Sequence, residues 1–391
     1  MQAVYKYIKG DRVIWAVVLL LAIFSVLVVY SSIVTLAYKY QGGNTEFYLF
    51  KHTVILLIGF LLMYCAHRVN YRYYSRISQI ALLLAIPLLL LTLLTGATIN
   101  DASRWLVIPI INQTFQTSDL AKLALIMFLA RMLSRRQDNI KDFSQAFLPI
   151  MIPVLVVCGL ILPANLSTAA MLFVTSLVLM FIGRINMAYI ISLITIGVVC
   201  LGIFVGIGLS ISETQTSNEN SAITNRVITW KNRIIDFVEG SPQANYQAEQ
   251  SKIAIATGGV VGKGPGRSTQ RNFLPQSYSD FIYATVIEEY GMLGGVFTLL
   301  LYLILLYRGI LIAKNAPRTF GSLLAIGLSF SLVFQAMINM AVAVNLFPVT
   351  GQPLPMVSMG GTSIWFTCLA IGVILSVSRV SETTKTQAQD V

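Results

Sequence analysis

Charged side chains are scarce in this chain. Only 11% of its 391 residues are Asp, Glu, Lys or Arg, against about 25% in soluble domains. The hydrophobic fraction is 56%, and the mean hydropathy is +0.75. A soluble protein this apolar could not cover its surface with polar groups, so the composition excludes an ordinary soluble domain.

Histidine and cysteine are too sparse for several kinds of site. The two histidines, His52 and His67, lie at the two ends of one apolar run, which argues against a Ser-His-Asp set or a His-based metal cluster. The four cysteines lie within or beside apolar runs without CxxC spacing, so neither a disulfide nor a metal site is indicated. No small-residue cleavage site follows the first apolar run, so we expect no removable signal peptide.

Long apolar runs are abundant. Runs of roughly 18 to 25 residues span a bilayer as helices, and these runs lack the alternation of barrel strands. Because only helices and closed barrels satisfy their backbone in lipid, we predict an all-α polytopic membrane protein, a single membrane domain over residues 1–391. About ten spans are predicted, at 13–33, 50–66, 78–96, 117–133, 147–163, 166–183, 187–210, 281–307, 320–346 and 357–378.

Lysine and arginine are distributed unevenly between the predicted loops. One set of short loops carries most of them, including Arg68, Arg131, Arg308 and Arg379, whereas the opposite short loops carry few. The positive-inside rule therefore predicts that both termini are cytoplasmic. The net charge of +11 largely reflects this asymmetry, and without a clustered basic domain no nucleic-acid partner is expected.

One long hydrophilic stretch, from about 211 to 279, lies between the seventh and eighth predicted spans and is expected outside the membrane. Its basic residues could attract anionic headgroups or diphosphates. Residues 226–238 have the spacing of an amphipathic helix at the interface, and 246–257 that of a second short helix. The glycine-rich run 258–266 could bind a diphosphate through backbone amides. Its spacing around Lys263 is not that of a Walker A loop, so no nucleotide cofactor is expected.

Ionisable residues near membrane depth are costly and are therefore candidates for function. Asp119 and Lys122 share a helix face, which fits either a binding role or a structural ion pair. Asp280 stands at the outer end of the eighth predicted span, where it could cap that helix or act on a substrate. Glu288 and Glu289 lie about two turns deeper and could instead hydrogen-bond neighbouring helices. A lone carboxylate near basic groups suits general-base chemistry on an anionic substrate.

A proline- and glycine-rich run follows the ninth predicted span, at 348–361. It cannot continue a straight helix, so we predict a re-entrant turn near the outer surface, tolerated where protein or a cavity buries it. Such a turn would be either a wall of a substrate groove or a plain loop.

Several longer motifs resemble a known family. Residues 246–291 read YQAEQSKIAIATGGVVGKGPGRSTQRNFLPQSYSDFIYATVIEEYG. Further matches are ASRW at 102–105, QTSDLAK at 116–122 and PVTGQPLPMVSMGGTS at 348–363. In this order, and over nearly the whole chain, these stretches resemble the SEDS family (shape, elongation, division and sporulation), whose members include FtsW and RodA. The outline is closer to the division-type FtsW than to the elongation-type RodA.

The resemblance implies a peptidoglycan glycosyltransferase, which polymerises lipid II into glycan strands at the outer face of the bacterial cytoplasmic membrane. Asp280 matches the family's catalytic base, which would deprotonate the acceptor 4-hydroxyl and lead to inversion at the anomeric carbon. The implied partners are the undecaprenyl-linked glycan, a class B penicillin-binding protein that crosslinks the strands, and other divisome proteins. A divalent cation, Mg²⁺ or Mn²⁺, is implied to help neutralise the diphosphate, and its ligands stay open.

Further residues are candidates for binding substrate and diphosphate. They are Lys51, Arg104, Asp119, Lys122, Lys263, Ser279 and Glu288. Departures from the family pattern fall on accessory positions. Gln276 and Asp119 stand where the family has glutamate, and Tyr278 stands where it has histidine. Asn165 stands where many relatives have aspartate, and Lys51 where arginine is usual. Lysine lacks the bidentate fork of arginine, so the change at Lys51 alters phosphate contacts.

Two other functions stay open. A transporter or flippase of lipid II would use buried charges such as Asp119 and Lys122, and would not need Asp280 for chemistry. A non-catalytic scaffold of the division machinery would need surfaces for partners but no acid at the level of the headgroups.

Overall fold

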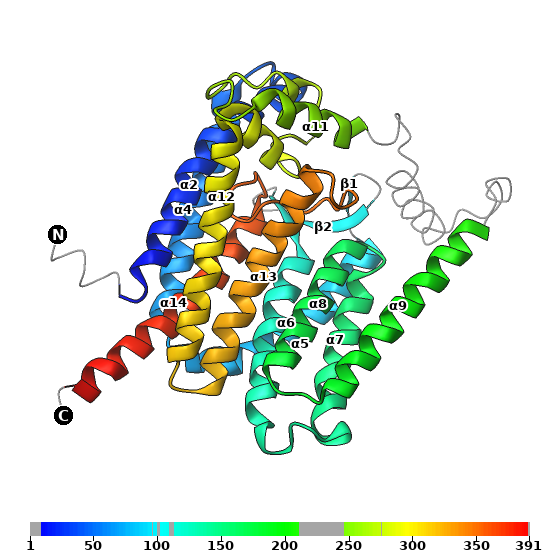
Figure 1. Ribbon diagram of the computed structural model, residues 1–391, viewed down its shortest axis with the longest axis vertical. Helices are drawn as coiled ribbons and strands as arrows, with labels where there is room; N and C mark the ends of the chain where they lie inside the picture. Colours follow the sequence, from blue (N-terminus) through cyan, green and yellow to red (C-terminus); the bar gives the residue numbers. More distant parts are fainter. Residues whose placement is uncertain are drawn as a thin grey trace.

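The computed structural model describes residues 9–95, 97–99, 102–108, 113–210, 246–274 and 276–389. Within these residues the chain forms a bundle of long helices, with a small sheet and a short helix toward one end (Figure 1). The predicted short helix at 246–257 is confirmed as α11, Tyr246–Gly258. The predicted amphipathic helix at 226–238 lies outside the described residues.

Each of the ten predicted spans lies over one long helix, which confirms the polytopic membrane fold. These helices are α2 (Arg12–Ser32), α4 (Thr45–Arg68), α5 (Tyr71–Thr95), α6 (Thr117–Arg135), α7 (Leu148–Ile161), α8 (Leu166–Ile182), α9 (Met187–Ser210), α12 (Ile282–Asn315), α13 (Thr319–Ala343) and α14 (Thr362–Gln389). Shorter helical pieces are α3 (Val34–Gln41), η1 (Gln137–Asn139), the π-helix η2 (Phe143–Phe147) and η4 (Gln270–Asn272). Within the described chain, 7 stretches are long and apolar enough to cross a membrane, and two other apolar helices are shorter.

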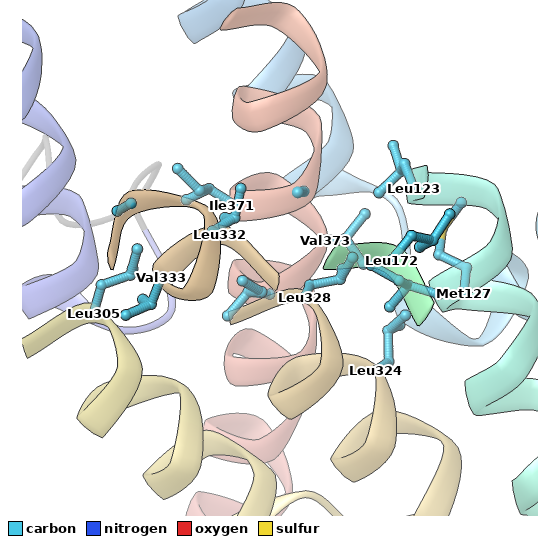
Figure 2. Packing of buried hydrophobic residues seen from close by; sticks show 14 of the residues in the cluster. Leu123, Met127, Leu172, Leu305, Leu324, Leu328, Leu332, Val333, Ile371 and Val373 are labelled. Atoms are coloured by element: carbon cyan, nitrogen blue, oxygen red, sulfur yellow. The ribbon is translucent and has the colours of Figure 1, made fainter. Parts of the chain in front are cut away.

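The helix α13 lies at the centre of the bundle. Three leucines recur along it every four residues, so their side chains form one stripe on a single face. Figure 2 shows this stripe within one buried cluster that α6, α8 and α14 complete, including Leu324, Leu328, Leu332, Leu123, Met127, Leu172, Ile371 and Val373. In the most apolar windows, 67% of α13 and 72% of α14 is buried, against 28% of α5, so α13 and α14 form the interior and α5 the rim.

A small antiparallel sheet was not predicted from the sequence. It consists of β1 (Ala97–Ile99), β2 (Ala102–Ile108) and β3 (Gln113–Gln116), in the order β1-β2-β3. Trp105 pairs with Gln116, and Leu106 with Phe115. Because β3 runs directly into α6 at Thr117, the sheet fixes where α6 begins.

The ends of the described chain meet at the cytoplasmic end predicted from the basic loops. Arg308 Nε of α12 donates to Asp11 Oδ2 at 2.8 Å, and Gly10 N donates to Glu382 Oε2 at 3.1 Å. Arg379 Nη2 of α14 donates to the carbonyl oxygen of Arg68 at 2.9 Å. Asp280, which precedes the first residue of α12, therefore lies at the other end of the bundle from these basic residues.

A kink interrupts α12 at Gly291, where φ is 69° and ψ is −173°. The loop after α11 packs backbone against backbone on this kink, since Met292 N donates to the carbonyl oxygen of Gly259 at 2.9 Å. A Cβ atom at Gly291 would lie 2.1 Å from the carbonyl oxygen of Val260. Only glycine fits here, because both the positive φ and the close approach exclude a side chain.

Gly291→Ala is therefore expected to destabilise the protein. The added Cβ forces α12 or its neighbouring loop to shift, at a cost of roughly 1–3 kcal/mol. Thermal unfolding in detergent should show a lower midpoint. The matched control is Gly159→Ala in α7, where nothing lies within 4 Å of the Cβ position and the midpoint should stay or rise. Equal midpoints for the two variants would contradict this account of the kink.

Candidate functional site

Asp280 lies in the turn that leads into α12. Asp280 directly precedes Phe281, which is the N-cap of α12. The carboxylate is half-buried, and its Oδ1 accepts a hydrogen bond from Ser279 Oγ at 2.9 Å. The structure thus brings together the predicted base and the predicted Ser279.

An irregular segment between α13 and α14, residues 352–359, holds the Asp280 turn in place. Met359 N donates to the carbonyl oxygen of Tyr278 at 2.9 Å, and Ser358 Oγ donates to that of Ser279 at 2.6 Å. These contacts show that the run packs on the Asp280 turn, and the groove-wall alternative stays a prediction. The predicted start of α14 at 357 is wrong: the irregular backbone continues through Gly361, whose φ is 53°, and α14 begins at Thr362.

Asp119 and Lys122 form an ion pair in the first turns of α6, with 3.4 Å between Lys122 Nζ and Asp119 Oδ1. Asp119 is only 4% exposed, and its Oδ2 has no hydrogen-bond partner among the described residues. Both side chains line a small hollow of about 20 Å³ between α6, α13 and α14, whose other walls are mostly apolar. The ion pair is therefore real, yet it leaves a buried oxygen that a polar group of a ligand could satisfy.

Lys263 and Glu288 form a second, closer ion pair. Lys263 Nζ lies 2.6 Å from Glu288 Oε1, and the Glu288 side chain is fully buried. The same carboxylate accepts hydrogen bonds from the Ser268 hydroxyl and from Thr269, whose N lies at 3.0 Å and whose Oγ1 lies at 2.9 Å. This closed cluster favours a structural role for both predicted residues, because it fixes the loop after α11 on α12.

The neighbouring Glu289 joins the same loop to α2. It accepts a hydrogen bond from the Ser31 hydroxyl of α2, and Arg271 Nη1 donates to Ser31 Oγ at 2.9 Å. The predicted alternative of hydrogen bonding between helices therefore holds for Glu289. Ser31 and Arg271 were missed from the sequence, because nothing in the local pattern shows that they meet.

The glycine-rich run does not offer its amides as the predicted diphosphate cradle. Gly262 N donates to the carbonyl oxygen of Gly258 at 2.9 Å, and Lys263 N donates to that of Glu288 at 3.0 Å. Gly264 N donates to the carbonyl oxygen of Glu289 at 2.9 Å. The expectation was wrong for these three amides, because carbonyl oxygens of Gly258 in α11 and of Glu288 and Glu289 in α12 already accept their hydrogen bonds.

Lys51 and Arg104 are the other two cations predicted to bind the diphosphate. Lys51 is half-buried on α4 and makes no hydrogen bond or ion pair within the part of the chain that the structure describes. Its neighbour His52 is buried, with Nε2 2.9 Å from Ser25 Oγ, which donates to the carbonyl oxygen of Val357 at 2.8 Å. Arg104 lies in β2, and its side chain lies outside the described part.

Two buried amides on α13, Gln335 and Asn339, contact the site and were not singled out from the sequence. Gln335 Oε1 accepts a hydrogen bond from Lys122 Nζ at 2.7 Å, and Asn339 Nδ2 donates to the carbonyl oxygen of Asp280 at 2.8 Å. Their signal was available, since polar amides inside a membrane span usually hydrogen-bond across helices.

Comparison with known proteins decides the family. Residues 11–383 match the sequence profile of FtsW, RodA and SpoVE, described as cell cycle proteins. The chain belongs to this family, the SEDS family. Stage V sporulation protein E of Bacillus subtilis is 34% identical over 380 residues, which cover 96% of this chain and 99% of that protein. A probable peptidoglycan glycosyltransferase FtsW of Geobacter sulfurreducens is 33% identical over 374 residues, 95% of each chain.

Solved structures agree with this membership. A chain from a peptidoglycan synthase complex that coordinates polymerization and crosslinking has a TM-score of 0.73 at 25% identity, covering 95% of this chain and 98% of that one. RodA of Thermus thermophilus has a TM-score of 0.65 at 24% identity, covering 95% and 97%. The multi-pass helical fold of the SEDS family is therefore confirmed for this chain.

Lys263→Met separates a structural role from a substrate contact in this SEDS protein. We expect a lower unfolding midpoint, because the buried Glu288 charge loses its cation. The cost should be roughly 1–3 kcal/mol, since Lys263 is partly exposed and the pair is screened. Lys252→Met, at an exposed position on α11, is the matched control and should not move the midpoint. An unchanged midpoint with lost activity would instead assign Lys263 to the substrate.

Proposed function

We propose that this chain is a peptidoglycan glycosyltransferase that polymerises lipid II at the outer face of the cytoplasmic membrane, with Asp280 as the general base. The observation that carries this proposal is Asp280 itself. Its carboxylate is half-buried and sits in a turn that the 352–359 segment holds in place. The relatives named as probable peptidoglycan glycosyltransferases support the reaction class.

The proposed reaction is a single displacement. Asp280 takes the proton of the acceptor sugar 4-hydroxyl, and that oxygen attacks the anomeric carbon of the lipid-linked donor. The new glycosidic bond forms while the bond between that carbon and the diphosphate oxygen breaks, so the lipid diphosphate leaves with the bonding electron pair. One base without a second carboxylate as nucleophile suits inversion at this carbon.

General-base catalysis of this kind contributes about 10²–10⁴-fold in rate. The rest must come from positioning both lipid substrates and from stabilising the charge on the leaving diphosphate. Lys122 beside the hollow and Lys51 on α4 are the cations that we propose for the second task. Ser279 would orient the base through its hydrogen bond to the carboxylate.

The family resemblance also implies a divalent cation, Mg²⁺ or Mn²⁺. Among the described residues, no group of three or more His, Cys, Asp or Glu side chains could hold a metal ion. Because Mg²⁺ is commonly held by one or two carboxylates together with substrate phosphates, the cation stays a proposal, and no step above depends on one.

We propose division as the cellular role, with a class B penicillin-binding protein and other divisome proteins as partners. Support comes from relatives named FtsW that match nearly the full chain, and from the similarity to a chain of a peptidoglycan synthase complex. An elongation role like that of RodA is the alternative. A flippase is less favoured, because Asp119 and Lys122 lie in the first turns of α6, near the outer end rather than midway along a transport path.

Asp280→Asn is expected to lower the rate of lipid II polymerisation by about 10²–10⁴-fold, because the amide cannot accept the proton. The measurement is glycan strand formation by purified protein in vesicles, with and without a class B penicillin-binding protein. The nearly identical size of the two side chains should leave the unfolding midpoint unchanged.

Glu249→Gln on α11 is the matched control, a carboxylate change on the same side of the molecule, and should keep wild-type activity. If Asp280→Asn polymerises like the wild type, the base lies elsewhere. If the wild type moves lipid II between leaflets without making strands, the flippase alternative replaces the polymerase.

A further inference from the structure

Two amides on one face of α13 stand between the predicted base and the predicted cation. Gln335 and Asn339 are four residues apart, so their side chains project from the same face, about 6 Å apart along the helix axis. They are 5% and 1% exposed, respectively. Amides buried this deeply in an apolar span need hydrogen-bond partners, and their partners show what they hold together.

Gln335 joins Lys122 to the 352–359 segment. Its Oε1 accepts a hydrogen bond from Lys122 Nζ at 2.7 Å, and its Nε2 donates to the carbonyl oxygen of Pro353 at 2.9 Å. An ammonium group only donates and a carbonyl oxygen only accepts, so the side chain between them must do both. An amide meets this requirement, whereas a carboxylate or an ammonium group meets only half of it.

Asn339 joins the Asp280 turn to the same segment. Its Nδ2 donates to the carbonyl oxygen of Asp280 at 2.8 Å and to that of Gln352 at 2.7 Å. Both hydrogens of the amide nitrogen are thereby used. Gln352 and Pro353 are consecutive, so the two amides donate hydrogen bonds to adjacent carbonyl oxygens of one short segment.

We propose that Gln335 and Asn339 are positioning residues that hold Lys122 and Asp280 at a fixed separation, with α13 as the rigid spacer. This inference rests on the proposed function, which assigns the base and the cation. Gln335 acts through Lys122, and Asn339 acts through the turn that carries Asp280. A purely structural role would require bonds to the bundle alone, whereas each amide makes one bond to a site residue and one to the shared segment.

The test combines steady-state kinetics of lipid II polymerisation with hydrogen–deuterium exchange on the full-length protein in vesicles or detergent. Asn339→Asp removes both donors at nearly constant volume, and Asn339→Ser keeps one donor in case the first variant folds poorly. Gln335→Glu keeps the acceptor for Lys122 and removes the donor to Pro353. Ser329→Ala, a buried change on the same helix, is the control.

We expect kcat to fall by roughly 10²-fold in Asn339→Asp, with a smaller fall in Asn339→Ser, while KM for lipid II stays near the wild-type value. Exchange should rise in both 276–281 and 352–359. Gln335→Glu should also lower kcat, but it should raise exchange in 352–359 alone. Ser329→Ala should change neither kcat nor exchange.

Wild-type kcat in both Asn339 variants, or unchanged exchange in 276–281 in both, would overturn the inference while Asp280→Asn still abolishes polymerisation. Failure of the proposed function looks different: the wild type would make no glycan strands at all. In that case the positioning role in catalysis falls with it, even if exchange rises in both segments.

Discussion

An irregular backbone inside a membrane bundle must find all its hydrogen-bond partners in the protein, because lipid supplies none. The 352–359 segment meets this constraint with side chains from three helices. The carbonyl oxygens of Gln352, Pro353, Pro355 and Val357 accept hydrogen bonds from Asn339, Gln335, Tyr302 and Ser25, respectively. Each bond removes the cost of a buried, unpaired acceptor, and together they prevent the segment from adopting another path. The turn that carries Asp280 is hydrogen-bonded to this segment. The position of the candidate base therefore depends on side chains that belong to α2, α12 and α13.

The loop after α11 solves the same problem in a different way. Its backbone amides bond directly to the main chain of α12 at the Gly291 kink, and Glu288 and Glu289 accept from the residues that follow. Two carboxylates buried in a span would be costly alone, but each is surrounded by donors of this loop or of α2. The Asp280 turn, which lies between the loop and α12 in the chain, is thus held from the loop side as well as by the 352–359 segment.

Hydropathy was sufficient to predict the ten long helices, because length and apolar content are properties of single runs of residues. Hydropathy failed where tertiary contacts determine the local backbone structure. The start of α14 moved to Thr362 because the 352–359 segment finds its partners on other helices, and the sheet at 97–116 was missed because its strands are short and pair only with one another. Asp280 and Lys122 could be found as rare charges in an apolar chain. Gln335 and Asn339 escaped the same search because they carry no charge, and Lys263 looked like a phosphate ligand because its partner Glu288 is distant in sequence.

Two of the three lysines that were predicted to bind a diphosphate differ in how their charge is paired. Lys263 lies 2.6 Å from a fully buried carboxylate, which neutralises its charge at short range. Lys122 lies 3.4 Å from Asp119 and makes its shorter bond, 2.7 Å, to the neutral amide of Gln335. A neutral acceptor fixes the position of an ammonium group without cancelling its charge, so Lys122 keeps more of its positive field for an anionic ligand. Only Asp119 Oδ1 contacts Lys122, and Asp119 Oδ2 has no hydrogen-bond donor in the described structure. Asp119 and Lys122 both line the hollow. A cation and an unpaired acceptor therefore lie side by side at the wall of this hollow.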